Sequence, residues 1–142
     1  MAFKKGVTEA IRLRKGQHFK RIEMRIIPRG CMRPSYANSL GDYWVDEHGI
    51  LQIRAVEMPD LMFSHYILVY EYFEAIRCYR DGVSLESIEK WDADHPDDDD
   101  PGSLEGCPYK TYHDNSLMLE RLACLQDGYT WEEYDNTLPV GG

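Results

Sequence analysis

The spacing of apolar residues changes near residue 60, and this change restricts the folds that the chain can adopt. Before that point, "RIEMRII" alternates apolar and charged residues before a proline, which is typical of a half-buried strand. "DYWV" and "ILQIRAV" then flank "DEHG", whose acidic residues and glycine suit a tight turn, so they predict a hairpin. We therefore expect a small antiparallel sheet made of the N-terminal strand and this hairpin.

After residue 60 the pattern becomes helical. From residue 61 to about 80, apolar residues recur every three or four positions, and Asp-Gly ends the pattern. A short helix capped by Ser84 is expected next, then a long helix over about 109–126. Thr130 and Glu133 have capping-box spacing for one more short helix. The prediction is α+β, with two longer and one or two short helices after the sheet.

The charge of the chain is divided unevenly. Residues 1–33 hold ten Lys or Arg and two acidic residues, which gives a net charge of +8. The remaining residues hold six Lys or Arg and 23 acidic residues, which gives a net charge of −17. We interpret residues 1–20 as a basic arm, which could contact nucleic acid, although a solvated arm or one lying on the chain's own acidic surface is favoured. Residues 21–142 are long enough for one domain with its own core. Within them, the acidic segment 92–102 is expected to be an exposed loop.

Membrane insertion and secretion are not expected. The basic N-terminal residues are not followed by the apolar core of a signal peptide, and no stretch approaches the roughly 18 apolar residues of a membrane span. A cytoplasmic protein without membrane contact is therefore predicted. Its four cysteines are far apart and form no CxxC pair, which indicates reduced thiols that lie mostly in the core: Cys31, Cys78, Cys107 and Cys124.

The segment "YEYFE" differs by one residue from the HExxE signature of metal-dependent hydrolases. At about 100° per residue, Tyr70 and Glu74 share one face of the helix, with Glu71 beside them. A zinc helix offers two ligands and a general base in this arrangement. Here Tyr70 occupies the first ligand position. His65 cannot replace the missing histidine, because it points to about the opposite side of the same helix.

The last helix carries a second set of polar residues. His113 and Glu120 are seven residues apart and so share a face. Antiparallel packing of the two long helices would gather a candidate site with Glu71 as the catalytic base and with Glu74, His113, Asp92 and Glu120 as metal ligands, beside Tyr70. Oxygen-rich ligands with a single histidine suit Mn²⁺, Mg²⁺ or Fe²⁺ better than zinc. The alternative is that these acids face solvent and the histidine is an ordinary surface or core residue.

Several stretches between residues 40 and 136 resemble a family of small uncharacterised phage and prophage proteins. These are "GDYWVDEHGILQIRAVEM", "YEYFEAIRC" with the following "YRDGVSLESIEKWD", "PYKTYH" through "LERLA", and "YTWEEYD". The family has a GDYW-type hairpin, an HExxE helix, a turn leading to an acidic FD pair, and a last helix that opens with PY and a histidine. The resemblance implies that Glu71 and Glu74 match the two glutamates of HExxE and that Asp92 matches the aspartate of FD. It also implies that His113 and Glu120 match the histidine and the glutamate of the last helix. Tyr70 is the exception, because the family has a histidine at that position.

This departure argues against zinc peptidase activity, because a phenol with a pKa near 10 replaces a good ligand. The sequence predicts a phage-type protein of the host cytoplasm with a degenerate zincin-like scaffold, in which a divalent metal other than zinc and a metal-free polar cluster both stay open. One alternative is an acidic interaction or anti-defence protein that binds a basic host partner. A lesser alternative is a nucleotide pyrophosphohydrolase of the MazG type, suggested by Glu71-x-x-Glu74 followed by Glu89-x-x-Asp92.

Overall fold

A computed structural model describes residues 11–12 and 18–137 and confirms the α+β class. Its strands are β1 (Ile11–Arg12), β2 (His18–Phe19), β3 (Arg21–Ile27), β4 (Gly41–Val45) and β5 (Ile50–Val56). Its helices are α1 (Leu61–Arg80), α2 (Leu85–Asp94), α3 (Lys110–Gln126) and α4 (Trp131–Asp135), with short 3-10 helices η2 (Pro34–Tyr36) and η3 (Pro101–Ser103). The bounds of α1 and the caps of α2 and α4 agree with the sequence pattern, because Ser84 accepts from the Ser87 amide and Thr130 forms the expected capping box.

The three-stranded sheet has the order β3-β5-β4 and is mixed, so the prediction of an antiparallel sheet is wrong for β3. β4 and β5 form the predicted hairpin, with Tyr43 opposite Ile53. β3 instead pairs in parallel with β5, with Ile22 beside Leu51. The connection over residues 28–40 carries the chain to the far edge of the sheet, so that the most apolar strand takes the centre. Alternation determines which face a side chain occupies but not the direction of the neighbouring strand.

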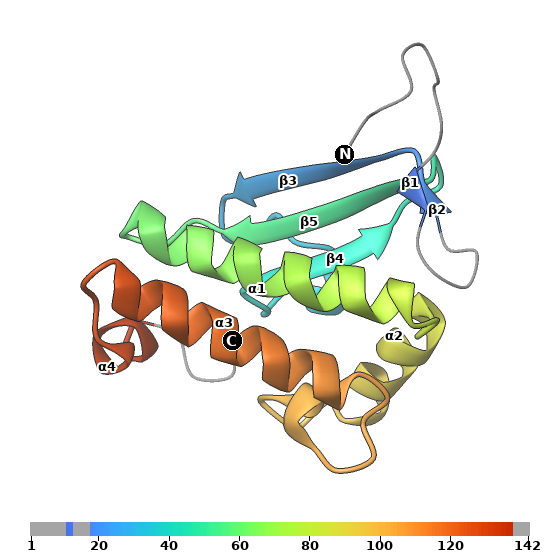
Figure 1. The fold of residues 1–142 in the computed structure, drawn as a ribbon. Coiled ribbons are helices and arrows are strands. Elements are labelled where there is room, and N and C mark those ends of the chain that lie inside the picture. The colour runs from blue at the N-terminus through green and yellow to red at the C-terminus, as the bar shows by residue number, and fades with distance from the viewer. Residues whose placement is uncertain (1–10, 13–17, 138–142) are drawn as a thin grey trace.

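Helix α1 lies between the sheet and α3 (Figure 1). It runs antiparallel to α3, as two hydrogen bonds at opposite ends of the pair show. The Tyr66 hydroxyl near the start of α1 donates to Asp127 just after α3 (2.6 Å), and the Tyr112 hydroxyl near the start of α3 donates to Asp81 just after α1 (2.8 Å). The two long helices therefore have the antiparallel arrangement that the candidate site requires.

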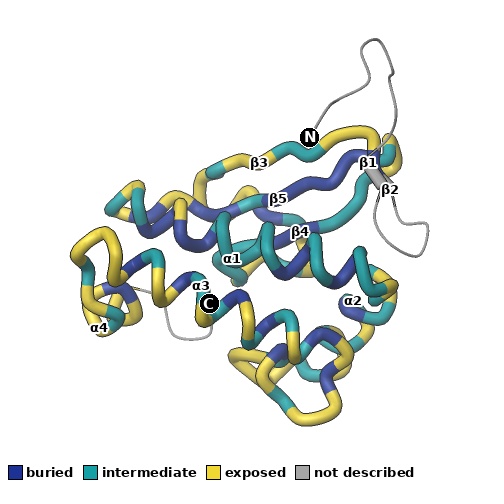
Figure 2. Tube along the Cα trace, viewed as in Figure 1, coloured by how far each residue is buried: buried dark blue, intermediate teal, exposed yellow. Residues whose placement is uncertain are grey.

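The main core forms where α1 covers the sheet. β5 is buried over most of its length (Figure 2). Leu51 and Ile53 are fully buried, and they belong to the same cluster as Ala75 and Cys78 of α1. Burial of a large aliphatic side chain contributes about 1.5–3 kcal/mol, so this face holds the central helix in place. The other face of the sheet also carries polar contacts, since Gln52 donates there to acidic side chains of neighbouring segments.

The region predicted as a basic arm is only partly described. β1 and β2 pair antiparallel, and Phe19 is buried with its ring 5.8 Å from that of Tyr79. The packed domain therefore begins slightly before residue 21. Residues 1–10 and 13–17, on which the nucleic-acid prediction rests, lie outside the described residues. Among the residues that are described, no helix combines the length and apolarity needed to cross a membrane.

Cysteine burial and the acidic loop agree in most respects with the sequence. Three cysteines are buried, Cys31 is exposed, and all four thiols are free. The acidic segment is exposed over residues 96–100, as predicted. Its ends differ from the prediction, because α2 continues to Asp94 and Gly102 is buried under a neighbouring helix. The prolines and aspartates break the helix a few residues later than the sequence suggested.

Candidate functional site

A cleft of about 770 Å³ opens between α1, α2, α3 and the connection from β3 to β4. It is the meeting point of segments that are far apart in the sequence. All the residues that the sequence singled out line this one cleft: Tyr70, Glu71, Glu74, Asp92, His113 and Glu120. The helical spacing therefore placed these residues on helix faces that meet in one cleft. The role of each residue depends on its contacts.

Glu74 is the most constrained carboxylate in the cleft. Only 4% of the residue is exposed, and its Oε1 accepts a hydrogen bond from the Tyr43 hydroxyl at 2.7 Å. Burial raises its pKa to about 7, although Tyr43 and His113 favour the ionised form. Tyr70 lies close enough to favour that form as well, but no described donor reaches the buried Oε2 with hydrogen-bond geometry. One oxygen of Glu74 is thus buried without a partner among the described residues.

Glu71 lies against the first residue of β4. A Cβ on Gly41 would come within 2.6 Å of the Glu71 Cγ atom, so any other residue at position 41 would have to displace the Glu71 side chain. Burial and the nearby Glu74 charge raise the pKa of Glu71 well above its usual value. The pKa of the Tyr70 phenol is likewise raised well above its usual value, first by burial and then by Glu74. Tyr70 is therefore a neutral phenol near neutral pH.

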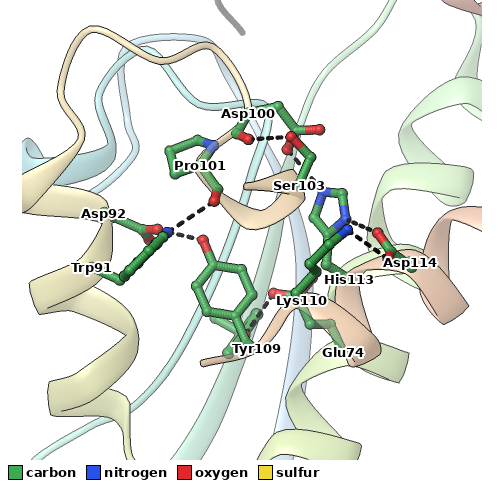
Figure 3. Close-up of polar contacts among 11 residues, drawn as sticks. Glu74, Trp91, Asp92, Asp100, Pro101, Ser103, Tyr109, Lys110, His113 and Asp114 are labelled. Carbon is green, nitrogen blue, oxygen red and sulfur yellow. Dashed lines mark hydrogen bonds and ion pairs between the residues drawn. The ribbon is translucent and has the colours of Figure 1, made fainter. Parts of the chain in front are cut away.

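His113 on α3 is held by carboxylates on both sides of its ring (Figure 3). Its Nε2 lies 2.8 Å from Asp100 Oδ1, and its Nδ1 lies 3.2 Å from Asp114 Oδ1. Burial alone would lower the pKa of the imidazole, but the hydrogen bond and charge of Asp100 raise it to about 9. Both nitrogens therefore carry protons near neutral pH. The ring packs edge-on against Tyr70, with centroids 5.7 Å apart.

Asp92 and Glu120 are bonded to tyrosines. The Tyr36 hydroxyl donates to one oxygen of Asp92 at 2.8 Å. The Tyr109 hydroxyl donates to the other oxygen (Figure 3). Glu120 is buried and accepts a longer hydrogen bond, 3.4 Å, from Tyr134. Burial raises the pKa of both carboxyls, and that of Glu120 reaches about 8. Each of these carboxylates depends on a phenol for its hydrogen bonds.

Several residues that shape the cleft have no signal in the sequence. Tyr43 and Tyr109 lie in the GDYW and PY stretches, which support the family resemblance but indicate no role for these tyrosines. Tyr36 lies in a segment without a regular pattern, and Asp100 belongs to the segment predicted as an exposed loop. All four line the cleft because the tertiary fold brings their segments to α1. Isolated tyrosines do not reveal a partner that is more than 30 residues away, as in the Tyr43–Glu74 pair.

The predicted metal ligands share a cleft without forming a ligand shell. Across residues 11–12 and 18–137, no group of three or more His, Cys, Asp and Glu is arranged to hold a metal ion. His113 is held by Asp100 and Asp114, and Asp92 is held by two phenols. The buried Oε2 of Glu74 accepts no hydrogen bond of normal geometry, but His113 and Asp92 already use their polar atoms in other contacts. These residues therefore fit a zinc site poorly.

Gly102 of η3 offers a test of how the cleft is closed. A Cβ there would lie 2.4 Å from His113 Cδ2 and 2.7 Å from Tyr109 Cε2. Gly102→Ala is therefore expected to push both side chains away and to cost about 1–3 kcal/mol in the free energy of unfolding. Urea denaturation would measure it, with the exposed neighbour Glu105→Ala as the control, which is expected to change stability by about 0.5 kcal/mol or less. Equal effects of the two substitutions would contradict this packing.

Comparison with known proteins finds no matching family model, no matching curated protein and no matching solved structure. The chemistry of the cleft is therefore the basis for assigning a function. That chemistry consists of buried carboxylates with raised pKa values, phenols that bond to them, and one imidazolium ring.

Proposed function

We propose that this protein is a binding protein that keeps the helical layout of a metal hydrolase but has lost zinc peptidase activity. The observation that carries the proposal is the state of His113. An imidazole binds a metal through a nitrogen lone pair, so it must be unprotonated at the ligating atom. Here both ring nitrogens face carboxylates, and the pKa of about 9 keeps both protonated near neutral pH.

Tyr70 supports the same proposal. In the zinc helix of a hydrolase, the first residue of the motif supplies a nitrogen ligand. Tyr70 presents a phenol whose pKa is raised by burial, so it does not supply a phenolate under ordinary conditions. Glu71 would be the general base if the cleft retained hydrolytic chemistry. That chemistry needs a metal ion to activate water, and the described residues contain no cluster of three His, Cys, Asp or Glu side chains arranged to hold one.

The second candidate is an acidic interaction protein with a basic partner, and one observation favours it. Nine of the residues that line the cleft are Asp or Glu, and none of these described lining residues is Lys or Arg. The exposed Asp98 and Asp99 extend this charge to the rim of the cleft. The two candidates are compatible, because a hydrolase-like cleft without its metal is an acidic cavity. A phage-type origin and a cytoplasmic location stay predictions from the sequence.

A pyrophosphohydrolase of the MazG type is not proposed. Those enzymes are all-α, whereas this chain has a three-stranded sheet. The acids of the second half-motif are also engaged elsewhere. Glu89 pairs with Arg33 at 2.9 Å, and Asp92 accepts hydrogen bonds from two tyrosines.

Metal content tests the proposed function. Protein purified without a histidine tag from zinc-, manganese- and iron-containing medium is expected to hold far less than one metal ion per chain by mass spectrometry. Tyr70→His restores a nitrogen ligand, and Asp100→Asn removes the anion that keeps His113 protonated, so the double variant is expected to take up zinc. His65→Ala, on an exposed residue outside the cleft, is the control. Stoichiometric metal in the native protein that is lost in Glu74→Gln would overturn the proposal.

A further inference from the structure

We propose that the cleft binds the guanidinium group of an arginine side chain presented by a basic protein. This inference rests on the proposed function, because it fills the cleft of a binding protein with a cation other than a metal. It specifies the chemistry of the ligand and the residues that recognise it. The acceptors are Glu74 and Glu71 at the base of the cleft, and tyrosine rings form the walls.

The first observation is a set of acidic side chains without a basic partner. Glu71, Glu74, Asp92 and Glu120 line the cleft, and none of them takes part in an ion pair with Lys or Arg among the described residues. The imidazolium of His113 also lies near these carboxylates, and it is paired with Asp100 and Asp114. Ionised carboxylates are costly to bury without a cation, which is why burial raises the pKa of these groups in the free protein. A cationic ligand would favour their ionised forms and would be favoured by them in turn.

The second observation is independent of the charge. Glu74 is only 4% exposed, lines the cleft, and accepts no hydrogen bond of normal geometry at Oε2, although the nearby Tyr70 phenol favours its ionised form. Buried polar atoms in native proteins nearly always have a partner, so an exception of this kind marks a place for a donor from outside the chain. A guanidinium N–H group would satisfy Oε2, while Tyr43 continues to occupy Oε1.

The lining of the cleft favours an organic cation over a metal ion. Tyr36, Tyr43, Tyr70 and Tyr109 line it together with the carboxylates, and aromatic faces attract cations with delocalised charge. The volume of about 770 Å³ is in the range of sites that enclose small organic groups. The absence of a ready ligand group for a metal among the described residues agrees with this choice.

Arg33 shows within the same molecule how such a group is held. Its guanidinium binds Asp42 through two nitrogens at 2.7 and 2.9 Å. A third nitrogen reaches Glu89 at 2.9 Å, and the group stacks 4.3 Å from the centre of the Trp44 ring. Carboxylates and aromatic rings therefore already hold one guanidinium at the edge of the cleft. Glu71 and Glu74 likewise line the cleft together with aromatic residues.

Binding is expected to strengthen as pH rises. Glu74 must be ionised to accept the cation, and its pKa of about 7 in the free protein means that protons leave as the ligand binds. Between pH 6 and pH 8 we expect affinity to rise roughly tenfold. The titratable groups that face Glu74 come from β4, α1, α2, α3 and the segment before α3: Tyr43, Tyr70, Glu71, Cys78, Asp92, Cys107, Tyr109 and His113.

Isothermal titration calorimetry of the full chain with capped tetra-arginine tests the proposal. The controls are capped tetra-citrulline, which keeps the shape without the charge, and capped tetra-lysine, which keeps the charge without the planar group. We expect binding of tetra-arginine, roughly tenfold weaker binding of tetra-lysine, and none of tetra-citrulline. Glu74→Gln should weaken tetra-arginine binding roughly tenfold or more. Glu132→Gln removes one exposed charge outside the cleft and should change it less than about twofold.

Two results would overturn the proposal. One is no binding of tetra-arginine at pH 8, and the other is an equal loss of affinity in Glu74→Gln and Glu132→Gln, which would mean general charge attraction. The thermal unfolding midpoint of each variant would show that it is folded. The metal content of the same samples separates this proposal from the proposed function. Bound zinc would contradict the proposed function. Metal-free protein that does not bind tetra-arginine would contradict only the guanidinium ligand.

Discussion

Replacing Glu120 with glutamine is expected to stabilise the folded protein in alkaline solution and to leave it nearly unchanged near pH 4. The pKa of Glu120 is raised by burial to about 8, from the ordinary value of 4.5. Below pH 4.5 the carboxyl is mostly protonated in both the folded and the unfolded chain, so its contribution to stability is present. As pH rises from about 4.5 to 8, the unfolded chain releases this proton first, and that stability is lost.

Glutamine mimics the protonated carboxyl at every pH and can still accept the hydrogen bond of Tyr134. We expect a gain of up to about 5 kcal/mol in the free energy of unfolding at pH 9, since the pKa rises from 4.5 to about 8 and each pKa unit corresponds to about 1.4 kcal/mol. Urea denaturation at pH 4 and pH 9 measures the difference. The control is Glu132→Gln, at an exposed position, which should not respond to pH in this way. An equal effect of Glu120→Gln at both pH values would show that the carboxyl titrates normally.

The pH dependence of stability bears on function, because it distinguishes carboxylates that stabilise the fold from carboxylates that destabilise it. A carboxylate that lowers stability at neutral pH does not contribute to holding the fold together. Glu74, with a pKa of about 7, and Glu71, with a raised pKa, share this property with Glu120. Sites that cost stability in the free protein are typical of positions held for a ligand. The three carboxylates therefore point to the same conclusion as the unpartnered oxygen of Glu74.

Much of the fold could be predicted because its signals are local. The helix over residues 61–80, the hairpin and the caps at Ser84 and Thr130 each depend on residues only a few positions apart. The parallel pairing of β3 with β5 could not be predicted in this way. The pairing depends on which strand occupies the centre of the sheet. The long connection after β3 allows β3 to lie parallel or antiparallel to its neighbour.

The candidate site was predictable to the same degree. Helical periodicity placed Tyr70 and Glu74 on one face and His113 and Glu120 on another, and the packing of α1 on α3 brought the two faces to one cleft. Their chemistry was not predictable, because it depends on contacts across the fold. Asp100, from an exposed loop, determines the protonation of His113, and no pattern near either residue indicates this contact.

Arg33→Met is expected to destabilise the protein more than the loss of any single hydrogen bond would. Arg33 binds Asp42 through two hydrogen bonds, and Asp42 is only 4% exposed. Methionine keeps much of the aliphatic length of the side chain but leaves that carboxylate buried without a cation. Breaking one side of a buried pair costs about 3–5 kcal/mol, so we expect a loss of that order in the free energy of unfolding near neutral pH.

The physical cause of this loss can be separated from simple loss of packing. Burial raises the pKa of Asp42 and Arg33 opposes that effect, so without Arg33 the carboxyl should bind a proton more readily and the variant should recover stability in acid. Arg33→Met/Asp42→Asn removes the buried charge as well and should regain part of the loss at pH 7. Lys90→Met, which breaks the exposed pair with Asp94, is the matched control and should cost less than about 1 kcal/mol. If the double variant were as unstable as Arg33→Met, the stacking of Arg33 on Trp44, rather than its charge, would hold this wall of the cleft.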